Sequence, residues 1–349
     1  MATLKDIARL ANTSLGTVDR ALNNKPGINK DTRQKILRIA KSLNYTPNRM
    51  GKALVLKKQN IKLGFILEPL DNPYFEDIKR GVEQQKLELE DYGITTYIFI
   101  MNTLEENEQL ELLERLRALG VSGIALNAIN SPAVQERIDH LVDQGIKVVT
   151  CNTDNSSSKR SCFVGFENEL SGRVAAELFA KFSGEKGKYL VEIGFKYILA
   201  HMDRLKGFSD KIKADYPDMT IVRILESREN DSIVLENTLR ALEEHPDLTG
   251  IYCTCFGING IVNALTIKNL QGKVKIICHD HMPRTDDYIR GGIVDATICQ
   301  DGAKHGYMAM KILSELVINN RESKKQIYLT TLDIRLQENL GDKAQDWEI

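Results

Sequence analysis

The stretch TLKDIARLANTSLGTVDRAL, residues 3–22, decides the fold of the amino-terminal part of the chain. Thr3 and Asp6 have the spacing of a capping box, which predicts that a first helix begins at Leu4. Its apolar residues recur at helical spacing as far as Ala11. Asn-Thr-Ser at 12–14 then breaks the helix, and Ser14 can cap a second helix that runs to about residue 22. The stretch therefore predicts two short helices joined by a tight turn.

The residues that follow complete a three-helix unit. Asn-Asn at 23–24 and Pro-Gly at 26–27 end the second helix, and a third helix is predicted from about residue 30 to 43. Two short helices across a tight turn, covered by a third, form a helix-turn-helix unit. The second helix would expose Leu15, Gly16, Thr17 and Arg20 at its amino-terminal end, which is the part of a recognition helix that reaches base edges.

Charge is divided unevenly along the chain. The 349 residues hold 47 basic and 48 acidic side chains, for a net charge of −1. Residues 1–58 nevertheless hold thirteen basic and three acidic ones, a net of +10, which leaves 34 basic and 45 acidic residues, a net of −11, for the remainder. A small basic module joined to a larger acidic one predicts a polyanion partner for the first.

From residue 61 onward, short β-rich runs alternate with longer amphipathic helical patterns. Such alternation predicts parallel sheets covered by helices on both faces, and ten strands favour two sheets over one. The polar run 155–158 is a candidate crossover between two lobes. The predicted strands are 62–67, 95–101, 123–127, 147–150, 162–164, 189–193, 221–225, 250–253, 275–278 and 296–299, and helices are predicted at 74–92, 105–119, 170–182, 203–215 and 303–317.

Other features narrow the class of protein. The six cysteines lack the spacing of a zinc site and the density of a disulfide framework, which favours reduced, mostly buried thiols. No charged-then-apolar leader opens the sequence, and no apolar run approaches the roughly 20 residues of a membrane span, so we expect a cytoplasmic protein. No nucleophile elbow, Walker loop or dinucleotide fingerprint is present, so we expect neither an enzyme nor a cofactor.

Three short motifs recur in the order and spacing of a known family. TLKDIA at 3–8, TVDRALN at 17–23 and LNYTPN at 43–48 resemble the amino-terminal domain of LacI-family repressors. The rest resembles the regulatory domain of that family, which is similar to periplasmic ribose-binding proteins, so the resemblance covers nearly the whole chain. It implies a helix-turn-helix domain over 1–46, a hinge helix and linker over 47–60, and an effector domain over 61–349. We expect its amino-terminal lobe at about 61–157 and 288–322, and its carboxy-terminal lobe at about 158–287 and 323–349.

The resemblance assigns residues to DNA recognition. Leu15, Gly16 and Arg20 take base-reading positions, and Arg20 can bond guanine O6 and N7 together. Asp19 stands where the family commonly has serine; it could accept from cytosine N4 or bond Arg20, but it would also repel phosphate. The alternative is that these side chains only solvate a helix face. The motifs place the further DNA-binding residues at Thr3, Thr17, Asn23, Tyr45, Asn48, Arg49, Lys52 and Leu54.

Residues 47–58 resemble the hinge helix of the family, which orders on DNA and pairs with its dimer mate in the minor groove. Leu54 takes the position of the leucine that wedges between central base pairs, a step that unstacks the bases and bends the site. Arg49, Lys52, Lys57 and Lys58 would meet phosphates. An ordinary buried helix residue is the other interpretation of Leu54.

Polar and aromatic side chains follow several of the predicted strands. Asn72, Tyr74 and Phe75 resemble the Asn-Pro-Phe-Phe segment of ribose-binding proteins, where the amide bonds sugar hydroxyls and the rings stack on the apolar sugar face. Core packing is the alternative for the two rings. Asn152 and Thr153 stand where sugar binders often carry Asp-Arg. Ligands of open parallel sheets lie beyond the carboxyl ends of strands, so we expect these residues in a cleft.

The second half of the chain supplies the other side of the expected cleft. Arg204 begins an Arg-x-x-Gly-aromatic pattern of the family and could fork two hydroxyls or a carboxylate. Asp280 and Gln300 each follow a strand and match sugar-contacting positions, and Phe256 would add a wall. A set that both donates and accepts hydrogen bonds suits a neutral sugar or cyclitol.

The sequence thus predicts a homodimeric repressor of operator DNA, controlled by a small sugar-like effector that closes the cleft. Release from DNA on effector binding is the family default, and corepression and activation stay open. A metal or catalytic cluster at Cys278–His281 is an alternative that lacks further ligands. A transport-type sugar-binding protein would share the α/β fold, but the basic amino-terminal module and the missing leader argue against it.

Overall fold

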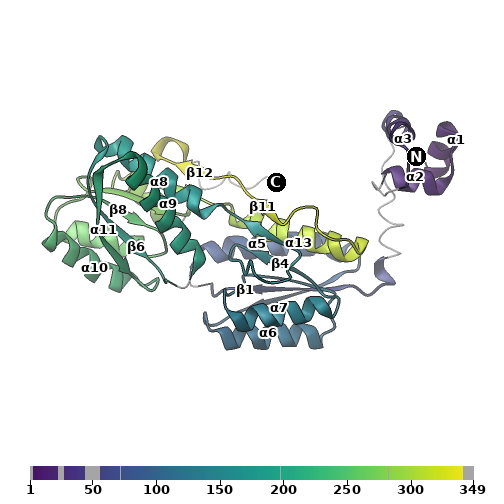
Figure 1. Ribbon diagram of the computed structural model, residues 1–349, viewed down its shortest axis with the longest axis horizontal. Coiled ribbons are helices and arrows are strands. Elements are labelled where there is room, and N and C mark those ends of the chain that lie inside the picture. Colours follow the sequence, from purple (N-terminus) through teal and green to yellow (C-terminus); the bar gives the residue numbers. More distant parts are fainter. Residues whose placement is uncertain are drawn as a thin grey trace. The chain divides into compact units, whose positions relative to one another are not determined.

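The computed structural model describes residues 3–22, 27–43, 56–70, 72–196, 198–281 and 283–340 (Figure 1). The chain divides into two compact units, Met1–Lys58 and Gln59–Ile349. The first unit has one apolar core, and the second has separate apolar cores in its two lobes.

The first unit contains the three helices that the sequence predicts: α1 (Leu4–Ala11), α2 (Leu15–Leu22) and α3 (Lys30–Ser42). The capping box is confirmed, since the Thr3 hydroxyl accepts from the backbone of Asp6 and the Asp6 carboxylate accepts from the backbone of Thr3. The helices bury a small shared core of Ile7, Ala8, Ala11, Val18, Ala21, Ile36 and Ala40. Lys35 on α3 donates to the Ala11 carbonyl at 3.1 Å, which satisfies a free carbonyl at the end of α1.

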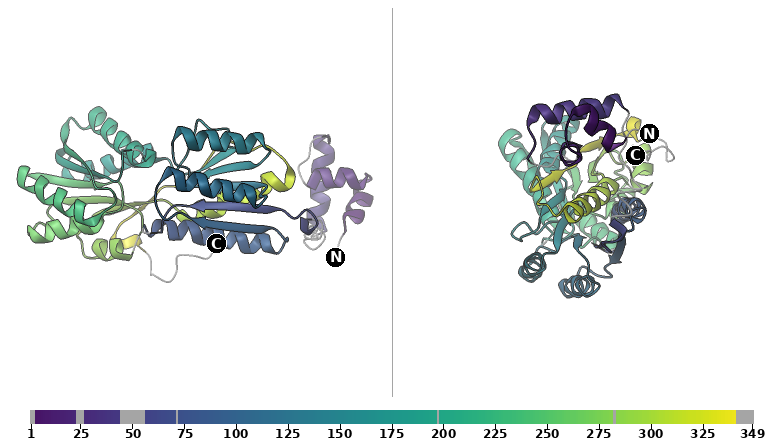
Figure 2. Two further views of the ribbon diagram at one scale, coloured as in Figure 1. Left: turned by 90° about the horizontal axis from the view of Figure 1, so that it is seen from below. Right: turned by 90° about the vertical axis from the view of Figure 1, so that its right-hand side faces the viewer.

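The second unit contains two sheets, as predicted, and each has six strands with helices on both faces (Figure 2). One sheet has the order β11-β5-β4-β3-β1-β2 and the other β12-β10-β9-β8-β6-β7. All neighbours are parallel except β10 and β12, which are antiparallel. The strands are β1 (Lys62–Leu67), β2 (Thr95–Ile100), β3 (Gly123–Leu126), β4 (Lys147–Cys151), β5 (Cys162–Gly165), β6 (Lys186–Ile193), β7 (Asp218–Glu226), β8 (Leu248–Cys253), β9 (Lys275–His279), β10 (Ala296–Cys299), β11 (Ile327–Leu329) and β12 (Asp333–Arg335).

Each sheet with its helices forms one lobe. In the first lobe α6 and α7 cover one face, while α5 and α13 pack against each other on the opposite face (Figure 1). In the second lobe α10 and α11 share one core, and α8 and α9 share another. The helices are α5 (Tyr74–Glu90), α6 (Glu106–Ala118), α7 (Pro132–Asp143), α8 (Asn168–Ser183), α9 (Leu199–Asp215), α10 (Asp231–Glu244), α11 (Ile258–Ile267), α12 (Pro283–Arg290) and α13 (Gly302–Asn319), with a short 3₁₀ turn at Gln337–Asn339.

The sheet order corrects the lobe boundaries expected from sequence. Residues 162–165 pair with β4 and therefore lie in the first lobe, whereas 296–299 pair with β9 in the second. Residues 327–329 return to the first sheet beside β5. The chain therefore crosses between the lobes three times, after β5, after β10 and after β11. The last crossing occurs because β11 completes the first sheet and β12 completes the second.

The polar run 155–158 is likewise not the predicted crossover. It lies in the turn between β4 and β5, which are neighbours in one sheet. The buried Asn155 amide donates to the carbonyls of Ile129 and Ser131, at 3.3 and 3.0 Å. The polar side chain of Asn155 thus satisfies buried carbonyl groups of the neighbouring loop, and the run does not link the two lobes.

Two further findings concern composition. All six cysteines are free and buried, which confirms the expectation of reduced thiols. Within the described ranges, no helix is long and apolar enough to cross a membrane.

Candidate functional site

The exposed amino-terminal end of α2 forms the first candidate site. The Ser14 hydroxyl caps the helix by accepting from the Thr17 backbone at 3.1 Å. Leu15 is 46% exposed, which is unusual for a large apolar side chain, and Gly16 and Arg20 are exposed too. Val18 and Ala21, on the opposite side, are buried in the three-helix core. The packing therefore directs Leu15, Gly16 and Arg20 toward solvent, where a partner can reach them.

The other predicted DNA-binding residues have different surroundings. Thr17 is half-buried, and its hydroxyl lies 2.9 Å from that of Ser14. Asp19 is half-buried, and Thr3 is the exposed cap of α1. The remaining predicted residues lie outside the described part of the chain, as does most of the predicted hinge helix: Asn23, Tyr45, Asn48, Arg49, Lys52 and Leu54.

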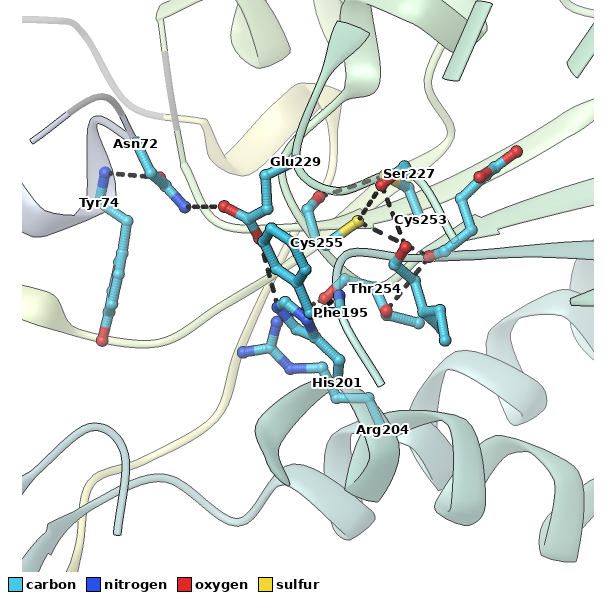
Figure 3. A network of polar contacts seen from close by, with 12 residues as sticks. Asn72, Tyr74, Phe195, His201, Arg204, Ser227, Glu229, Cys253, Thr254 and Cys255 are labelled. Atoms are coloured by element: carbon cyan, nitrogen blue, oxygen red, sulfur yellow. Dashed lines mark hydrogen bonds and ion pairs between the residues drawn. The ribbon is translucent and has the colours of Figure 1, made fainter. Parts of the chain in front are cut away.

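The second candidate site lies where the carboxyl ends of the strands of the two lobes face each other. The Asn72 amide, beyond β1 in the first lobe, donates to the Glu229 carboxylate, beyond β7 in the second, at 3.4 Å (Figure 3). Nε2 of His201, on α9, lies 3.3 Å from Oε1 of the same Glu229 carboxylate. His201 Nδ1 accepts from the Phe195 backbone at 3.1 Å, which fixes the orientation of the ring beside Glu229.

Tyr74 connects several parts of the first lobe. Its hydroxyl donates to Asn152 Oδ1 at 3.1 Å and lies 2.8 Å from His305 Nδ1. His305 Nε2 lies 2.7 Å from the Thr330 hydroxyl, so the imidazole is enclosed between two polar groups. Burial lowers the pKa of His305 to about 3 and raises the pKa of Tyr74 well above its usual value, so both are neutral. Asn152 has a left-handed φ of 63°, which turns its side chain off the end of β4.

Asp280 and Gln300 meet in the second lobe, beyond β9 and β10. Gln300 Nε2 donates to Asp280 Oδ2 at 3.3 Å, while Asp280 Oδ1 is buried with no partner among the described groups. Burial raises the pKa of Asp280 to about 6, and the positive charge of Arg204 is the largest opposing effect. An unpaired buried oxygen costs free energy unless a ligand bonds it.

Arg204 is held by its own lobe. Its Nε donates to Asn168 Oδ1 at 2.9 Å and its Nη1 to the Thr254 carbonyl at 2.7 Å. Arg204 is only 4% exposed. Two donors of the guanidinium are thus used by the protein, which fixes its plane and leaves less of the fork for a ligand than the sequence suggested.

The two predicted aromatic walls differ. Phe75 is buried and meets Tyr74 edge to face, with ring centroids 5.5 Å apart, so it packs as a core residue. Phe256, after β8, is half-buried. The structure therefore brings Tyr74 to Asn152 and Asp280 to Gln300, and joins Asn72 to a residue that the sequence analysis did not select.

Four residues of the cleft were missed. Glu68 directly follows β1, so its position at a strand end was a usable signal, and it accepts from the Thr153 hydroxyl at 3.3 Å. Glu229 and His201 contact each other across 28 residues of sequence, and His305 meets Tyr74 from a helix 231 residues away. No local pattern marks those three.

The segment Cys278–His281 has structural partners. His279 Nε2 lies 2.7 Å from the Tyr252 hydroxyl, and His281 Nδ1 lies 3.0 Å from Asp286. In the ranges that the structure describes, no group of three or more candidate ligands is arranged to hold a metal ion.

A helix-turn-helix unit joined to a two-lobed α/β domain with a polar cleft defines a DNA-binding regulator with a ligand-binding domain. Family comparison agrees: residues 3–48 match the lacI family of bacterial regulatory proteins, and residues 63–321 match a periplasmic binding protein domain. The chain belongs to the lacI family of bacterial regulatory proteins and is a sequence-specific transcription regulator.

Named relatives and solved structures support this. The ribose operon repressor of Bacillus subtilis (strain 168) is 34% identical, over 82% of this chain and 83% of that protein. The transcriptional regulator MalR of Clostridium butyricum is 25% identical, over 94% of this chain and 97% of the MalR chain. The structure of a glucose-galactose binding protein from Geobacillus stearothermophilus matches with a TM-score of 0.74 at 25% identity, covering 80% of this chain and 98% of that one. These are regulators and binding proteins, in line with the prediction that the chain is not an enzyme.

Proposed function

We propose that the chain is a repressor whose hold on operator DNA is controlled by a small sugar or cyclitol bound between the lobes. The observation that carries the proposal is the buried, unpaired Oδ1 of Asp280, beside the amide of Gln300 and the fixed cation of Arg204. A carboxylate, an amide and a guanidinium that converge in a cleft suit a ligand with several hydroxyls, each able to donate and accept. The ribose operon repressors and the glucose-galactose binding protein named above support this class of ligand.

On the DNA side we propose a homodimer that places two α2 helices in successive major grooves of a roughly palindromic operator. Arg20 reads a guanine, and Leu15 contacts an apolar edge such as a thymine methyl. Thr3, Thr17 and Asp19, together with the predicted residues outside the described part, complete the interface, with Leu54 as the minor-groove wedge. A protein with this task works in the cytoplasm, where the operator is.

The effector acts by preferring one arrangement of the lobes. A ligand shifts a two-state protein only by its differential affinity for the two states. Coupling of about 1–3 kcal/mol, typical between allosteric sites, would change operator affinity by about 5- to 150-fold. Asn72 and Glu229, which join the lobes directly, are placed to respond when a ligand enters.

The test combines ligand binding with operator release. A thermal-shift screen against pentoses, hexoses, inositols, sugar phosphates and nucleobases identifies the class of ligand, because a ligand that binds only the native protein raises the melting temperature. Arg204→Ala should lose the response to the hit and keep operator binding. Stabilisation by nucleobases alone, or loss of operator binding by the folded variant, would refute the proposal.

A further inference from the structure

Glu229 joins the two sides of the cleft. It lies three residues beyond β7 in the second lobe, and its side chain is 20% exposed. Oε2 accepts from the Asn72 amide of the first lobe at 3.4 Å, and Oε1 lies 3.3 Å from His201 Nε2 (Figure 3). Both distances exceed the roughly 2.9–3.0 Å that is usual for an N–H···O hydrogen bond. The carboxylate is therefore held loosely, and its oxygens can accept from a further donor.

The backbone at Glu229 matches that of two predicted effector-binding residues. Asn152 and Asp280 each follow a strand directly, and both have left-handed φ values, of 63° and 67°. Glu229 has a φ of 57°, and Arg228 before it has a φ of 51°. Asparagine and aspartate adopt this conformation more readily than glutamate does, so its occurrence at Glu229 indicates a constraint from the surrounding structure. Such constraints are typical of ligand-binding positions.

The turn that carries Glu229 is held in place by the second lobe. The Arg228 N–H donates to the Gly194 carbonyl at 2.9 Å, and the Asn230 side chain caps α10 by accepting from two backbone N–H groups. Gly194 also leaves the space that the carboxylate needs, because a Cβ there would lie 2.9 Å from Glu229 Oε1 and 2.5 Å from Cε1 of His201. The carboxylate is therefore positioned by the fold before a ligand enters.

Asn72 and Glu229 together place a donor beside an acceptor. Asn72 Oδ1 accepts from the Tyr74 backbone at 3.1 Å, so the amide presents its N–H groups to the second lobe. Glu229, as a carboxylate, has only acceptor atoms. A ligand hydroxyl can accept from the amide and donate to the carboxylate at the same time. A ligand carboxylate or phosphate could only accept from the amide, and the charge of Glu229 would repel it.

We propose that Glu229 is an effector-binding residue, which with Asn72 holds one hydroxyl of a neutral sugar or cyclitol and excludes sugar acids and sugar phosphates. The inference rests on the proposed function and narrows the class of effector. The hydroxyl exchanges the Asn72–Glu229 contact for two hydrogen bonds, one to each lobe. Because both lobes then bond the same ligand atom, binding favours the arrangement in which the lobes lie close together.

Matched neutral and anionic compounds test the proposal by isothermal titration calorimetry. D-glucose is compared with D-glucuronate, D-galactose with D-galacturonate, D-ribose with D-ribose 5-phosphate, and myo-inositol with myo-inositol 1-phosphate. We expect at least one neutral compound to bind, and its anionic partner to bind about 10- to 100-fold more weakly. The anion loses a hydrogen bond to a charged group and meets a charge of its own sign.

Variants locate the effect at Glu229. Glu229→Gln keeps the size of the side chain and one acceptor oxygen but removes the charge, so the preference for the neutral compound should fall to about 3-fold or less. Glu229→Ala also removes the acceptor and should weaken binding of the neutral compound about 10-fold. Glu236→Gln, which removes an exposed carboxylate of α10, should behave as the wild type. Retained operator binding shows that a variant is folded.

The outcomes separate the inference from the proposed function. An anionic partner that binds the wild type as tightly as its neutral compound overturns the inference and leaves the proposed function standing. A preference that survives Glu229→Gln does the same, because the charge of Glu229 is then not its cause. If neither variant at this position retains operator binding, the wild-type comparison decides alone. Binding by no sugar or cyclitol, neutral or anionic, overturns both.

Discussion

Glu192 provides a direct test of the buried electrostatics of the second lobe. It lies at the end of β6 and is fully buried. Oε2 accepts from the Asn237 amide at 3.3 Å, and Oε1 has no partner among the described groups. Burial raises the pKa of Glu192 from 4.5 to about 8, so the native protein holds a proton there at neutral pH.

The effect on stability follows from proton linkage. The unfolded chain ionises Glu192 near pH 4.5, whereas the native protein ionises it near pH 8. Between these values the native state binds more protons, so stability falls as pH rises, by about 1.4 kcal/mol per pH unit at most. The stability that the buried, protonated Glu192 contributes is fully present below pH 4.5. Its loss levels off above about pH 8. From pH 5 to pH 7.5 the expected loss is about 3 kcal/mol.

Glu192→Gln removes this titration. We expect the free energy of unfolding of the variant to fall by about 3 kcal/mol less than that of the wild type over the same pH interval. The amide of the variant can change the free energy of unfolding through its two N–H groups, but that change is the same at every pH and does not affect the slope. Urea unfolding at pH 5, 6, 7 and 7.5, followed by circular dichroism and by intrinsic fluorescence, measures the slope. Glu236→Gln, on the exposed side of α10, is the control. Parallel curves for wild type and Glu192→Gln would refute a buried, protonated Glu192.

Three further predictions concern other parts of the molecule. Arg20→Ala should weaken binding to the operator by about 10-fold or more, and binding to random DNA less, because a bidentate contact with guanine contributes about 1–3 kcal/mol; gel-shift titrations with both duplexes measure this, and equal losses would contradict it. Gly81→Ala should lower the melting temperature, because its Cβ would come within 1.8 Å of the Ala303 carbonyl where α5 packs on α13, whereas Glu83→Ala on the same helix should not. His305 is held neutral with a pKa of about 3 against 6.5 in the unfolded chain, so its own contribution to stability should fall by about 3 kcal/mol as pH falls from 6.5 to 4, against the opposite contribution of Glu192. His305→Gln should flatten that acid slope in urea titrations, and an unchanged slope would count against the buried neutral imidazole.

The sequence predicted the elements well because their signals are local. Capping by Thr3, the break at residues 12–14 and the alternation of β-rich and amphipathic runs each extend over few residues. All ten predicted strands are present, with end differences of a few residues. The two missed strands, β11 and β12, are three residues long and partly exposed, so neither has enough periodicity to be seen.

The candidate site was predictable only in part. Asn72, Asn152, Asp280 and Gln300 follow strands, and a polar side chain at the end of a parallel strand is visible in the sequence. The sequence does not show which of these side chains contact one another. Phe75 has the same local signal as Tyr74, yet it packs in the core, because the side chains along a helix start point in different directions.

The sequence by itself determined the helix-turn-helix unit, the basic and acidic division, and the α/β class of the second unit, since each depends on residues near one another or on composition. Only the tertiary structure decided the lobe boundaries, the fixed plane of Arg204, and the contact of Asn72 with Glu229. The physical reason is that sheet order and cleft contacts join residues far apart in the sequence, by 36 and 50 positions for Arg204 and by 157 for Asn72 with Glu229. Periodicity along the chain carries no information about such contacts.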